Sequence, residues 1–468
     1  MAAFIIFGAG KIGRRIVETL RIIGMHPLAV IDNDHNLWGN ELYNVPIASP
    51  DSISKLKYDY ILIAIKNNDE IRNQLRDLNV SDDKIICVSS VLQLLESNFI
   101  RILNNTNSNS NCICREKTSE KVLFDMSNGM AMGGVESWSV NSSLLLNKRG
   151  KKCFLIVNGD KPAEMSDCGI SKIEYNNQEN FCDYINNILL IFVSEKPCAL
   201  VCNFVSYFLW AAVLAKMAFP SEIDLIVTQH SDDMTYYNGY GKYMDCIDSY
   251  LYVSNRIGSL LEKNNANCKY KKVIWEIESA GKRCRSCADA DEELRVGYAG
   301  RITKTAKRCD LLLAIIRRTK ERSEKIHFYI AGDGDYSAEM IHEIRRYNLN
   351  ESVDMIGAIP HDKIMNFWED KDVYISCSEY EGHSISQCEA MAAGAVPVVT
   401  NVSGVEDDII DGADGFVVDI GDVDMLVDSL LKLQCDRAML ENMGNCARKT
   451  IEEKYSREAA VKFWEEVL

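Results

Sequence analysis

The chain has 468 residues, 47% of them hydrophobic and 26% charged, which is the composition of a core-forming globular protein and excludes wholesale disorder. At about 100–200 residues per domain, this length predicts about three domains. The 52 basic and 68 acidic residues leave a formal net charge of −16, which argues against a nucleic-acid partner or an anionic bilayer but allows a local phosphate site.

The first 104 residues have the pattern of a small doubly wound sheet. Apolar runs alternate with helical patterns, and strands are expected at 3–7, 28–31, 60–64 and 84–88. The next segment, 105–119, is rich in Asn, Ser and Thr without apolar periodicity, which is typical of a linker. We therefore expect a separate Rossmann-like domain over 1–104.

The first expected strand leads into a glycine-rich turn. Gly8, Gly10 and Gly13 are spaced G-x-G-x-x-G, and Asp32 ends the second strand, where such folds place a ribose-binding carboxylate. The unit resembles small Rossmann-like domains found beside sugar-modifying acyltransferases and some methyltransferases, which implies nucleotide-sugar binding more than hydride transfer. A scaffold that keeps its glycines for turn geometry is the alternative, and a nicotinamide-dependent oxidoreductase is a second one.

Two further series of alternating strands and helices follow. The first, over 120–290, has expected strands at 121–125, 153–157, 200–204, 224–228, 250–253 and 272–275. The second, over 291–468, has expected strands at 295–299, 326–331, 353–356, 373–376, 396–399 and 415–418. The apolar run 197–219 is interrupted by Asn203 and Lys216, so we interpret it as a buried strand and a core helix and not as a membrane span. The predicted fold class is α/β with three Rossmann-like units.

The last unit carries the most informative pattern. Its expected strand 373–376 runs into Glu381-Gly382-His383-Ser384-Ile385, and Glu389 follows on the next helix. The first amides of that helix would bind a phosphate, and the two carboxylates would accept hydroxyl hydrogen bonds from a sugar and a ribose. Glu389 alone would fit a first-turn acid favoured by the helix dipole.

Other candidate residues follow strands upstream. Arg301 and Lys307 come after the strand 295–299 and could neutralise a diphosphate without a metal, although the nearby Lys304 and Arg308 leave the choice of cations open. Gly133 and Gly134 lie between a strand and a helix, where a plain turn is the alternative. His230 follows another strand and could also be a packed histidine. Asp232 and Asp233 beside it fit a surface turn better than a metal site.

These residues together resemble the GT-B retaining glycosyltransferases related to sucrose synthase and bacterial mannosyltransferases, usually called family 4. The order GGxE, H-x-D, GR…K, GDG and E-x₇-E is similar to that of the family over about 350 residues, 120 to 468, and implies that the last two units form one GT-B enzyme with a closing helix at 455–468. The turn after Glu381 departs from the usual Glu-Gly-Phe-Gly, because His383, Ser384 and Ser386 are polar, so the donor sugar is not implied.

The resemblance implies specific roles. Gly133 and Gly134 would let the backbone approach the donor diphosphate, Arg301 and Lys307 would bind it, and His230 would face the reacting sugar. Glu381, with the turn Gly382-His383-Ser384-Ile385, would bind that sugar, and Glu389 the ribose. The implied activity is transfer from a nucleoside-diphosphate sugar to a saccharide or lipid-linked acceptor, without a cofactor or nucleic acid. A non-catalytic nucleotide-sugar-binding protein is the alternative from another class.

The cysteines bear on the compartment. There are 17, an odd number, scattered and without a secretory signal before them, which favours free thiols in the cytoplasm with at most peripheral contact with the inner face of a membrane. A zinc site made of Cys112, Cys114, Cys284 and Cys287 is disfavoured by the one-residue spacing of the first pair, so no metal is expected.

Overall fold

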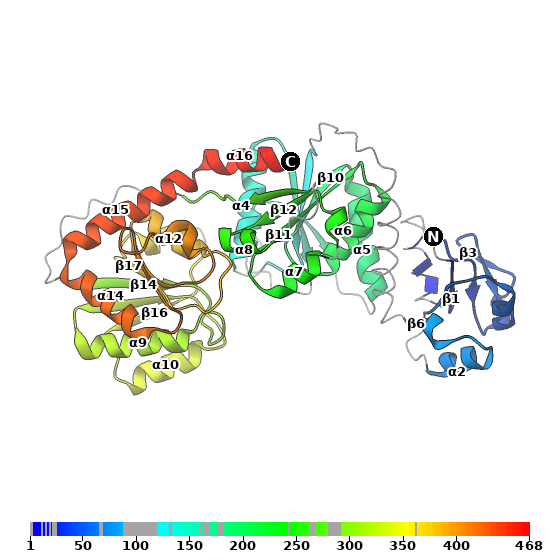
Figure 1. Ribbon diagram of the computed structural model, residues 1–468, viewed down its shortest axis with the longest axis horizontal. Coiled ribbons are helices and arrows are strands. Elements are labelled where there is room, and N and C mark those ends of the chain that lie inside the picture. The colour runs from blue at the N-terminus through cyan, green and yellow to red at the C-terminus, as the bar shows by residue number, and fades with distance from the viewer. Residues whose placement is uncertain are drawn as a thin grey trace.

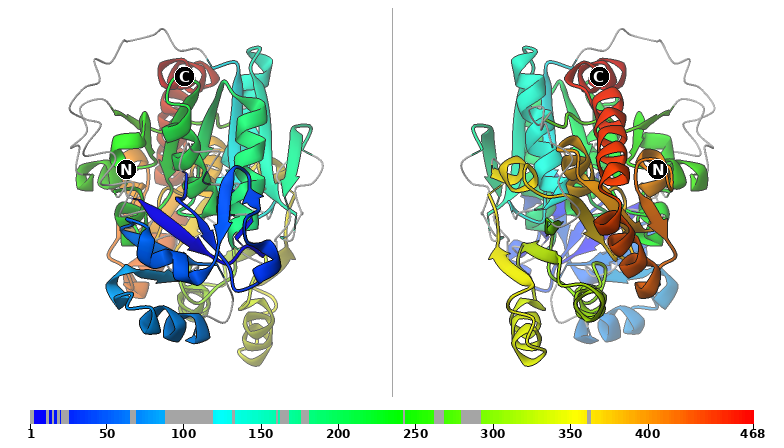
Figure 2. Two further views of the ribbon diagram at one scale, coloured as in Figure 1. Left: turned by 90° about the vertical axis from the view of Figure 1, so that its right-hand side faces the viewer. Right: turned by 90° about the vertical axis from the view of Figure 1, so that its left-hand side faces the viewer.

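The computed structural model contains three sheets with helices between their strands (Figure 1). It describes residues 3–10, 13–14, 16–17, 20, 26–64, 69–87, 119–130, 133–159, 161, 168–175, 181–241, 243–261, 268–278, 292–360 and 363–468. The four cysteines weighed as a zinc site and nearly all of the expected linker lie outside these residues. The N-terminal sheet lies at one end of the molecule, next to the middle sheet (Figure 1), and it is in front of the other two sheets when that end faces the viewer (Figure 2, left).

The N-terminal sheet has the strand order β3-β4-β2-β1-β5-β6. Its elements are β1 (Phe4–Phe7), β2 (Val30–Ile31), η1 (His35–Leu37), β3 (Glu41–Leu42), β4 (Val45–Ala48), η2 (Pro50–Lys55), β5 (Tyr60–Ile63), α2 (Asp69–Asp77), η3 (Asp82–Lys84) and β6 (Ile85–Cys87). The antiparallel β3–β4 hairpin was not expected. Its two-residue turn, Tyr43-Asn44, has φ of 52° and 65°, a conformation that hairpin turns usually form with Gly, and no Gly marks this turn in the sequence.

The middle sheet has the order β13-β12-β11-β10-β7-β8-β9, with all pairs parallel. Its elements are β7 (Lys121–Met126), α4 (Gly134–Lys148), β8 (Lys152–Asn158), β9 (Ser171–Tyr175), α5 (Phe181–Glu195), β10 (Cys198–Cys202), α6 (Tyr207–Ala218), β11 (Ile223–Gln229), α7 (Met234–Gly241), η5 (Met244–Cys246), β12 (Ser249–Tyr252), α8 (Asn255–Leu260) and β13 (Lys269–Lys272). The edge strand expected at 272–275 was therefore placed three residues too late.

Edge strands were hard to predict because little of their surface is buried. β13 reads Lys-Tyr-Lys-Lys and β9 reads Ser-Lys-Ile-Glu-Tyr, and most of these residues are partly or fully exposed. The apolar run 197–219 does form the buried β10 and the core helix α6, as expected. Among the described residues, no helix is both long and apolar enough to span a bilayer.

The third sheet has the order β16-β15-β14-β17-β18-β19, the order of a Rossmann fold. Its elements are β14 (Leu294–Ala299), α9 (Cys309–Arg322), β15 (Ile326–Ala331), α10 (Ser337–Arg346), β16 (Val353–Gly357), α11 (Ile364–Trp368), β17 (Val373–Ser376), α12 (Ile385–Ala392), β18 (Val396–Thr400), α13 (Val405–Asp408), β19 (Phe416–Val418), α14 (Val423–Cys435), α15 (Arg437–Lys454) and α16 (Arg457–Val467). The expected α/β class with three Rossmann-like units is confirmed.

The last helix joins the two C-terminal sheets. α15 packs along the third sheet, and α16 continues over the middle sheet, where Trp464 stacks on Trp138 of α4 with ring centroids 5.8 Å apart (Figure 1). Trp464 also meets Phe124 of β7 edge to face. One apolar cluster therefore runs from the middle sheet to the helices of the third.

Candidate active site

The candidate residues come from the two places where strand order reverses. In the middle sheet this point lies between β7 and β10, and in the third sheet between β14 and β17. Ligands of open α/β sheets bind beyond the carboxyl ends of strands at such points. Gly133 and Gly134 follow β7, Arg301 follows β14, and Glu381 follows β17.

The two reversal points lie against each other. A Cβ on Gly134 would be 3.7 Å from Ile385 Cδ1, so the N-terminus of α4 faces that of α12. A Cβ on Gly382 would lie 1.8 Å from the His230 carbonyl oxygen, so only glycine fits there. A Cβ on Gly133 would come within 2.5 Å of Glu136 Oε2, the flexible end of a side chain in the same helix. Gly134 and Gly382 thus lie where the two halves meet, and the two helix N-termini there are each favourable for an anion.

Lys307 and Glu381 form an ion pair at this junction. Lys307 Nζ lies 2.5 Å from Glu381 Oε1, and the side chains are 18% and 12% exposed. The same carboxylate oxygen accepts a hydrogen bond from the Ser378 hydroxyl at 2.8 Å. The other oxygen, Oε2, is not used in either contact, so the pair combines a fixed positive charge with an acceptor for a sugar hydroxyl.

The geometry separates Arg301 and Lys307 from the neighbouring cations. Lys304 pairs with Glu339 at 2.7 Å, and Arg308 pairs with Asp310 and Glu379, each at 3.1 Å. Arg301 is exposed and, within the part of the chain that the structure describes, its guanidinium makes no hydrogen bond or ion pair.

Arg301 acts across the junction on Glu136 of α4. Burial raises the pKa of the Glu136 carboxyl, and the positive charge of Arg301 partly offsets this rise. An electrostatic link therefore connects the guanidinium to the other half of the site. Arg301 is nevertheless a cation that makes no hydrogen bond or ion pair among the described residues, an arrangement that suits a diphosphate.

Glu389 lies inside α12 and not in its first turn, so the interpretation as a first-turn acid is wrong. The residue is 6% exposed, and burial raises the pKa of its carboxyl to about 8. Without a ligand the side chain is therefore mostly protonated at neutral pH and can donate one hydrogen bond as well as accept others.

The raised pKa of Glu389 predicts a pH effect on stability. The pKa of about 8 in the folded protein exceeds the ordinary glutamate pKa of 4.5, so the stabilisation by the protonated side chain is fully present below pH 4.5 and is lost as pH rises through 8. Glu389→Gln carries no titrating proton, so its free energy of unfolding should not fall in this way. Measured by urea unfolding, its stability relative to the wild type should therefore rise by on the order of 1–4 kcal/mol between pH 5 and pH 8.5. The exposed Glu351→Gln is the control and should follow the wild type. Parallel curves for wild type and Glu389→Gln would contradict this.

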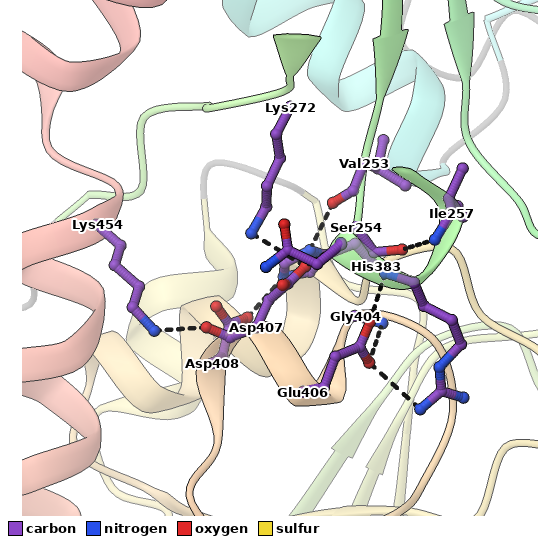
Figure 3. A network of polar contacts seen from close by, with 12 residues as sticks. Val253, Ser254, Ile257, Lys272, His383, Gly404, Glu406, Asp407, Asp408 and Lys454 are labelled. Atoms are coloured by element: carbon purple, nitrogen blue, oxygen red, sulfur yellow. Dashed lines mark hydrogen bonds and ion pairs between the residues drawn. The ribbon is translucent and has the colours of Figure 1, made fainter. Parts of the chain in front are cut away.

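The turn residues divide in their roles. Ser384 caps α12, because its hydroxyl accepts a hydrogen bond from the Gln387 amide at 3.3 Å, and it also meets Tyr374 Oη at 3.2 Å. His383 turns its imidazole into the interior: Nδ1 lies 2.9 Å from the Val253 carbonyl oxygen and Nε2 lies 2.6 Å from Asp408 Oδ2 (Figure 3). The expectation that the His383 side chain contacts the donor sugar is therefore wrong. Only the backbone of this residue is left for that role.

His383 belongs to a polar network that joins the two C-terminal sheets (Figure 3). Lys272 of β13 pairs with the buried Asp407 at 3.0 Å, and Ser254 bonds Ser403 at 2.7 Å. The Asn255 amide also donates to Asp407 Oδ2, the Arg256 amide donates to Glu406, and Lys454 donates to the Asp407 carbonyl. The N-terminus of α8 is thus hydrogen-bonded to the acidic side chains of α13.

His230 lies beside the Gly382 turn, and its ring is edge-to-face to that of Trp138 with centroids 5.2 Å apart. Burial lowers the pKa of the imidazole to about 3, so the ring is neutral at physiological pH. Asp233 accepts the Thr235 amide at 2.7 Å at the start of α7, which agrees with the turn interpretation. The structure also places Asn203 beside His230, and Asp125 beside Asn203. The only signal for them in the sequence was their position at the ends of two apolar strands.

In the N-terminal domain the motif residues contact one another. Asp32 Oδ2 accepts the Ala9 amide at 2.6 Å and Oδ1 accepts the Asp34 amide at 2.8 Å. A Cβ on Gly13 would lie 1.7 Å from the Gly8 carbonyl oxygen, whereas one on Gly10 would meet no atom within 4 Å. Gly13 and Asp32 are therefore explained by turn packing, which supports the scaffold alternative, and Gly10 is not.

Comparison with known proteins identifies two parts of the chain. Residues 286–450 match the family described as glycosyl transferases group 1, and residues 1–86 match the family described as C2185-like, N-terminal. A poly(ribitol-phosphate) alpha-N-acetylglucosaminyltransferase of Staphylococcus aureus is 28% identical over 170 residues, 36% of this chain and 34% of that protein. The capsular polysaccharide biosynthesis glycosyltransferase CapM of Staphylococcus aureus is 25% identical over 207 residues, 44% of this chain and 49% of that protein. The chain thus spans less than half of either relative.

Solved structures show the same fold. Anabaena Alr3699/HepE in complex with UDP and glucose aligns with a TM-score of 0.61 and 14% identity, over 74% of this chain and 99% of that one. Sucrose-phosphate synthase from Thermosynechococcus elongatus aligns with a TM-score of 0.59 and 16% identity, over 74% and 98%. These are GT-B folds, so the expected pairing of the last two units is confirmed. Residues 286–450 of this chain belong to the group 1 glycosyl transferases, carried on a GT-B fold behind a C2185-like N-terminal domain.

Proposed function

We propose that this chain is a retaining glycosyltransferase that moves a sugar from a nucleoside-diphosphate sugar to a polysaccharide or glycolipid acceptor. The observation that carries the proposal is the meeting of the two reversal points. It brings Arg301, Lys307 and Glu381 beside the N-termini of α4 and α12. Two cations and two sets of helix amides suit a diphosphate leaving group, and an adjacent carboxylate suits a sugar.

Each residue has a role in this proposal. Arg301 and Lys307 stabilise the negative charge that develops on the diphosphate, without a metal or other cofactor, and Gly133 and Gly134 admit it to the helix amides. Glu381 holds the transferred sugar through the oxygen that Lys307 does not use. His230, Gly382, the backbone at His383, Ser384 and Ile385 enclose that sugar, and Glu389 binds the ribose. The new bond forms on the face that the leaving group departs from, which retains the anomeric configuration.

The relatives suggest which substrates to test first. The two Staphylococcus aureus proteins act, by their names, on poly(ribitol-phosphate) and in capsular polysaccharide synthesis, and the Anabaena structure holds UDP and glucose. A UDP-sugar donor and a cell-surface polymer or its lipid-linked precursor are therefore the proposed substrates. The cysteines that the structure describes are free thiols, which supports a cytoplasmic site of reaction.

The test is release of nucleoside diphosphate by the full chain from a panel of UDP-, GDP- and ADP-sugars, with and without extracted polysaccharide and lipid acceptors. We expect one donor to be consumed faster with an acceptor and to raise the melting temperature. Arg301→Ala and Glu381→Ala should each abolish turnover while keeping the wild-type circular dichroism spectrum. Donor binding without turnover would favour the non-catalytic alternative, and full activity of either variant would refute the site.

A further inference from the structure

A chain of hydrogen bonds runs across the carboxyl ends of three adjacent strands of the middle sheet, β7, β10 and β11, and ends at His230. Asn203 follows β10, has no exposed surface and lies between Asp125 of β7 and His230, which follows β11. Its Nδ2 donates to the Asp125 carbonyl oxygen and to Ser139 Oγ, both at 2.9 Å. A backbone carbonyl can only accept, so this atom of the amide is the nitrogen, and the oxygen Oδ1 points the other way, 3.0 Å from His230 Nε2.

Further contacts hold the amide in this orientation. The Asp125 carboxylate accepts the Asn203 backbone amide at 3.3 Å and the Ser127 amide at 2.9 Å, so both ends of Asn203 are tied to β7. Ser139 Oγ donates to the Val135 carbonyl at 2.9 Å, which leaves its lone pairs for Asn203. A flip of the amide would set its oxygen against a carbonyl oxygen and is therefore disfavoured.

The orientation of Asn203 decides the tautomer of His230. Amide Oδ1 has no proton, so His230 Nε2 must carry the hydrogen of their hydrogen bond. Burial lowers the pKa of the ring to about 3, so it carries one proton only. Nδ1 is therefore a bare acceptor, and none of the described residues donates a hydrogen bond to it. The residue lies against the Gly382 turn, next to Glu381.

We propose that Asn203 is a positioning residue that holds His230 in the Nε2–H tautomer, so that Nδ1 accepts a hydrogen bond from a hydroxyl group of the transferred sugar. The inference rests on the function proposed above and narrows its substrate class. A bare lone pair attracts a hydroxyl and repels a carboxylate, so the donor carries a neutral sugar at this position and not a uronic acid.

The first test is spectroscopic and needs no substrate. The full chain is labelled with ¹⁵N in its seven histidines, and His230→Gln identifies the His230 signals. Long-range ¹H–¹⁵N spectra should show a neutral Nε2–H ring at pH 6 to 8 in the wild type and a mixture of tautomers in Asn203→Ala. Thr228→Val is the matched control, because the Thr228 hydroxyl on the same strand is buried without a partner in the described structure. It should leave the signals unchanged. An Nδ1–H or charged ring in the wild type would overturn the proposal, even if Asn203→Ala failed to fold.

The second test separates positioning from a structural role. Asn203→Ala should lower kcat by about tenfold to a hundredfold, more than it changes the KM of the donor. Added to His230→Gln, it should cause no further loss, because both changes remove the same contact. Additive losses, or equal use of hexose and uronic acid donors, would overturn the proposal. Absence of transfer with every donor would refute the proposed function but would leave the tautomer measurement standing.

Discussion

Lys307→Ala is expected to lower the kcat of sugar transfer by about 10²–10³-fold, the effect of removing one donor aimed at developing charge. Lys307 lies 2.5 Å from Glu381 with little exposure, so its charge acts in a medium of low dielectric constant. The variant loses the charge that neutralises the diphosphate and also the partner that orients the carboxylate. Initial rates at saturating donor measure the effect.

Lys304→Ala is the matched control for Lys307→Ala. Lys304 lies in the same loop but is exposed and pairs with Glu339 on α10. Surface pairs of this kind contribute about 0–1 kcal/mol, so this variant should keep wild-type kcat and stability. If both lysine variants lost activity equally, the loop as a whole and not the Lys307 charge would be responsible. Wild-type kcat in Lys307→Ala would contradict its assignment.

The second large effect is expected at the junction of the two C-terminal sheets, where His383→Phe should destabilise the protein by about 3–5 kcal/mol. His383 and Asp408 are 1% and 0% exposed and 2.6 Å apart. Phenylalanine would leave the buried carboxylate with hydrogen bonds from the Tyr455 hydroxyl at 2.8 Å, the Cys388 thiol at 3.4 Å and the Gln387 amide at 3.5 Å, but without a charged partner. Urea unfolding at pH 6.5 measures the change. His327→Phe is the control, because His327 pairs with the exposed Asp354 and should cost less than about 1 kcal/mol.

The same pair predicts a pH dependence. Burial alone would lower the pKa of His383, but the Asp408 carboxylate and the hydrogen bonds outweigh it and raise that pKa above 6.5. Burial likewise opposes the Asp408 charge, yet His383 brings the net pKa of that carboxyl below 3.8. The stabilisation by His383 is therefore present below pH 6.5 and lost as pH rises through its raised pKa, and that by Asp408 is present above pH 3.8. A His383→Phe curve parallel to the wild type at alkaline pH would contradict an ionised pair.

The central strands and their glycine turns were predictable because local physics determines them. Runs such as 295–299 and 373–376 are apolar enough to be buried on both faces, and the polar or glycine residues that end them, including Arg301 and Glu381, mark the carboxyl edge of the sheet. Strand order then brings those ends to one place. The hairpin at Tyr43-Asn44 was missed because two non-glycine residues adopt left-handed conformations there. The pairing of β4 with its neighbours β2 and β3 accompanies this turn and is not visible in the local sequence.

The sequence by itself determined the α/β class, the three units and the residues at the carboxyl ends of the strands, because hydrophobic period and turn chemistry are local properties. Only the tertiary structure decided where side chains point. It turned His383 away from the expected sugar site and into a buried pair with Asp408, and it linked Asn203 to His230, 27 residues away. Hydrogen-bond direction depends on which strands become neighbours, and that information lies in the packing of the whole chain and not in any segment of it.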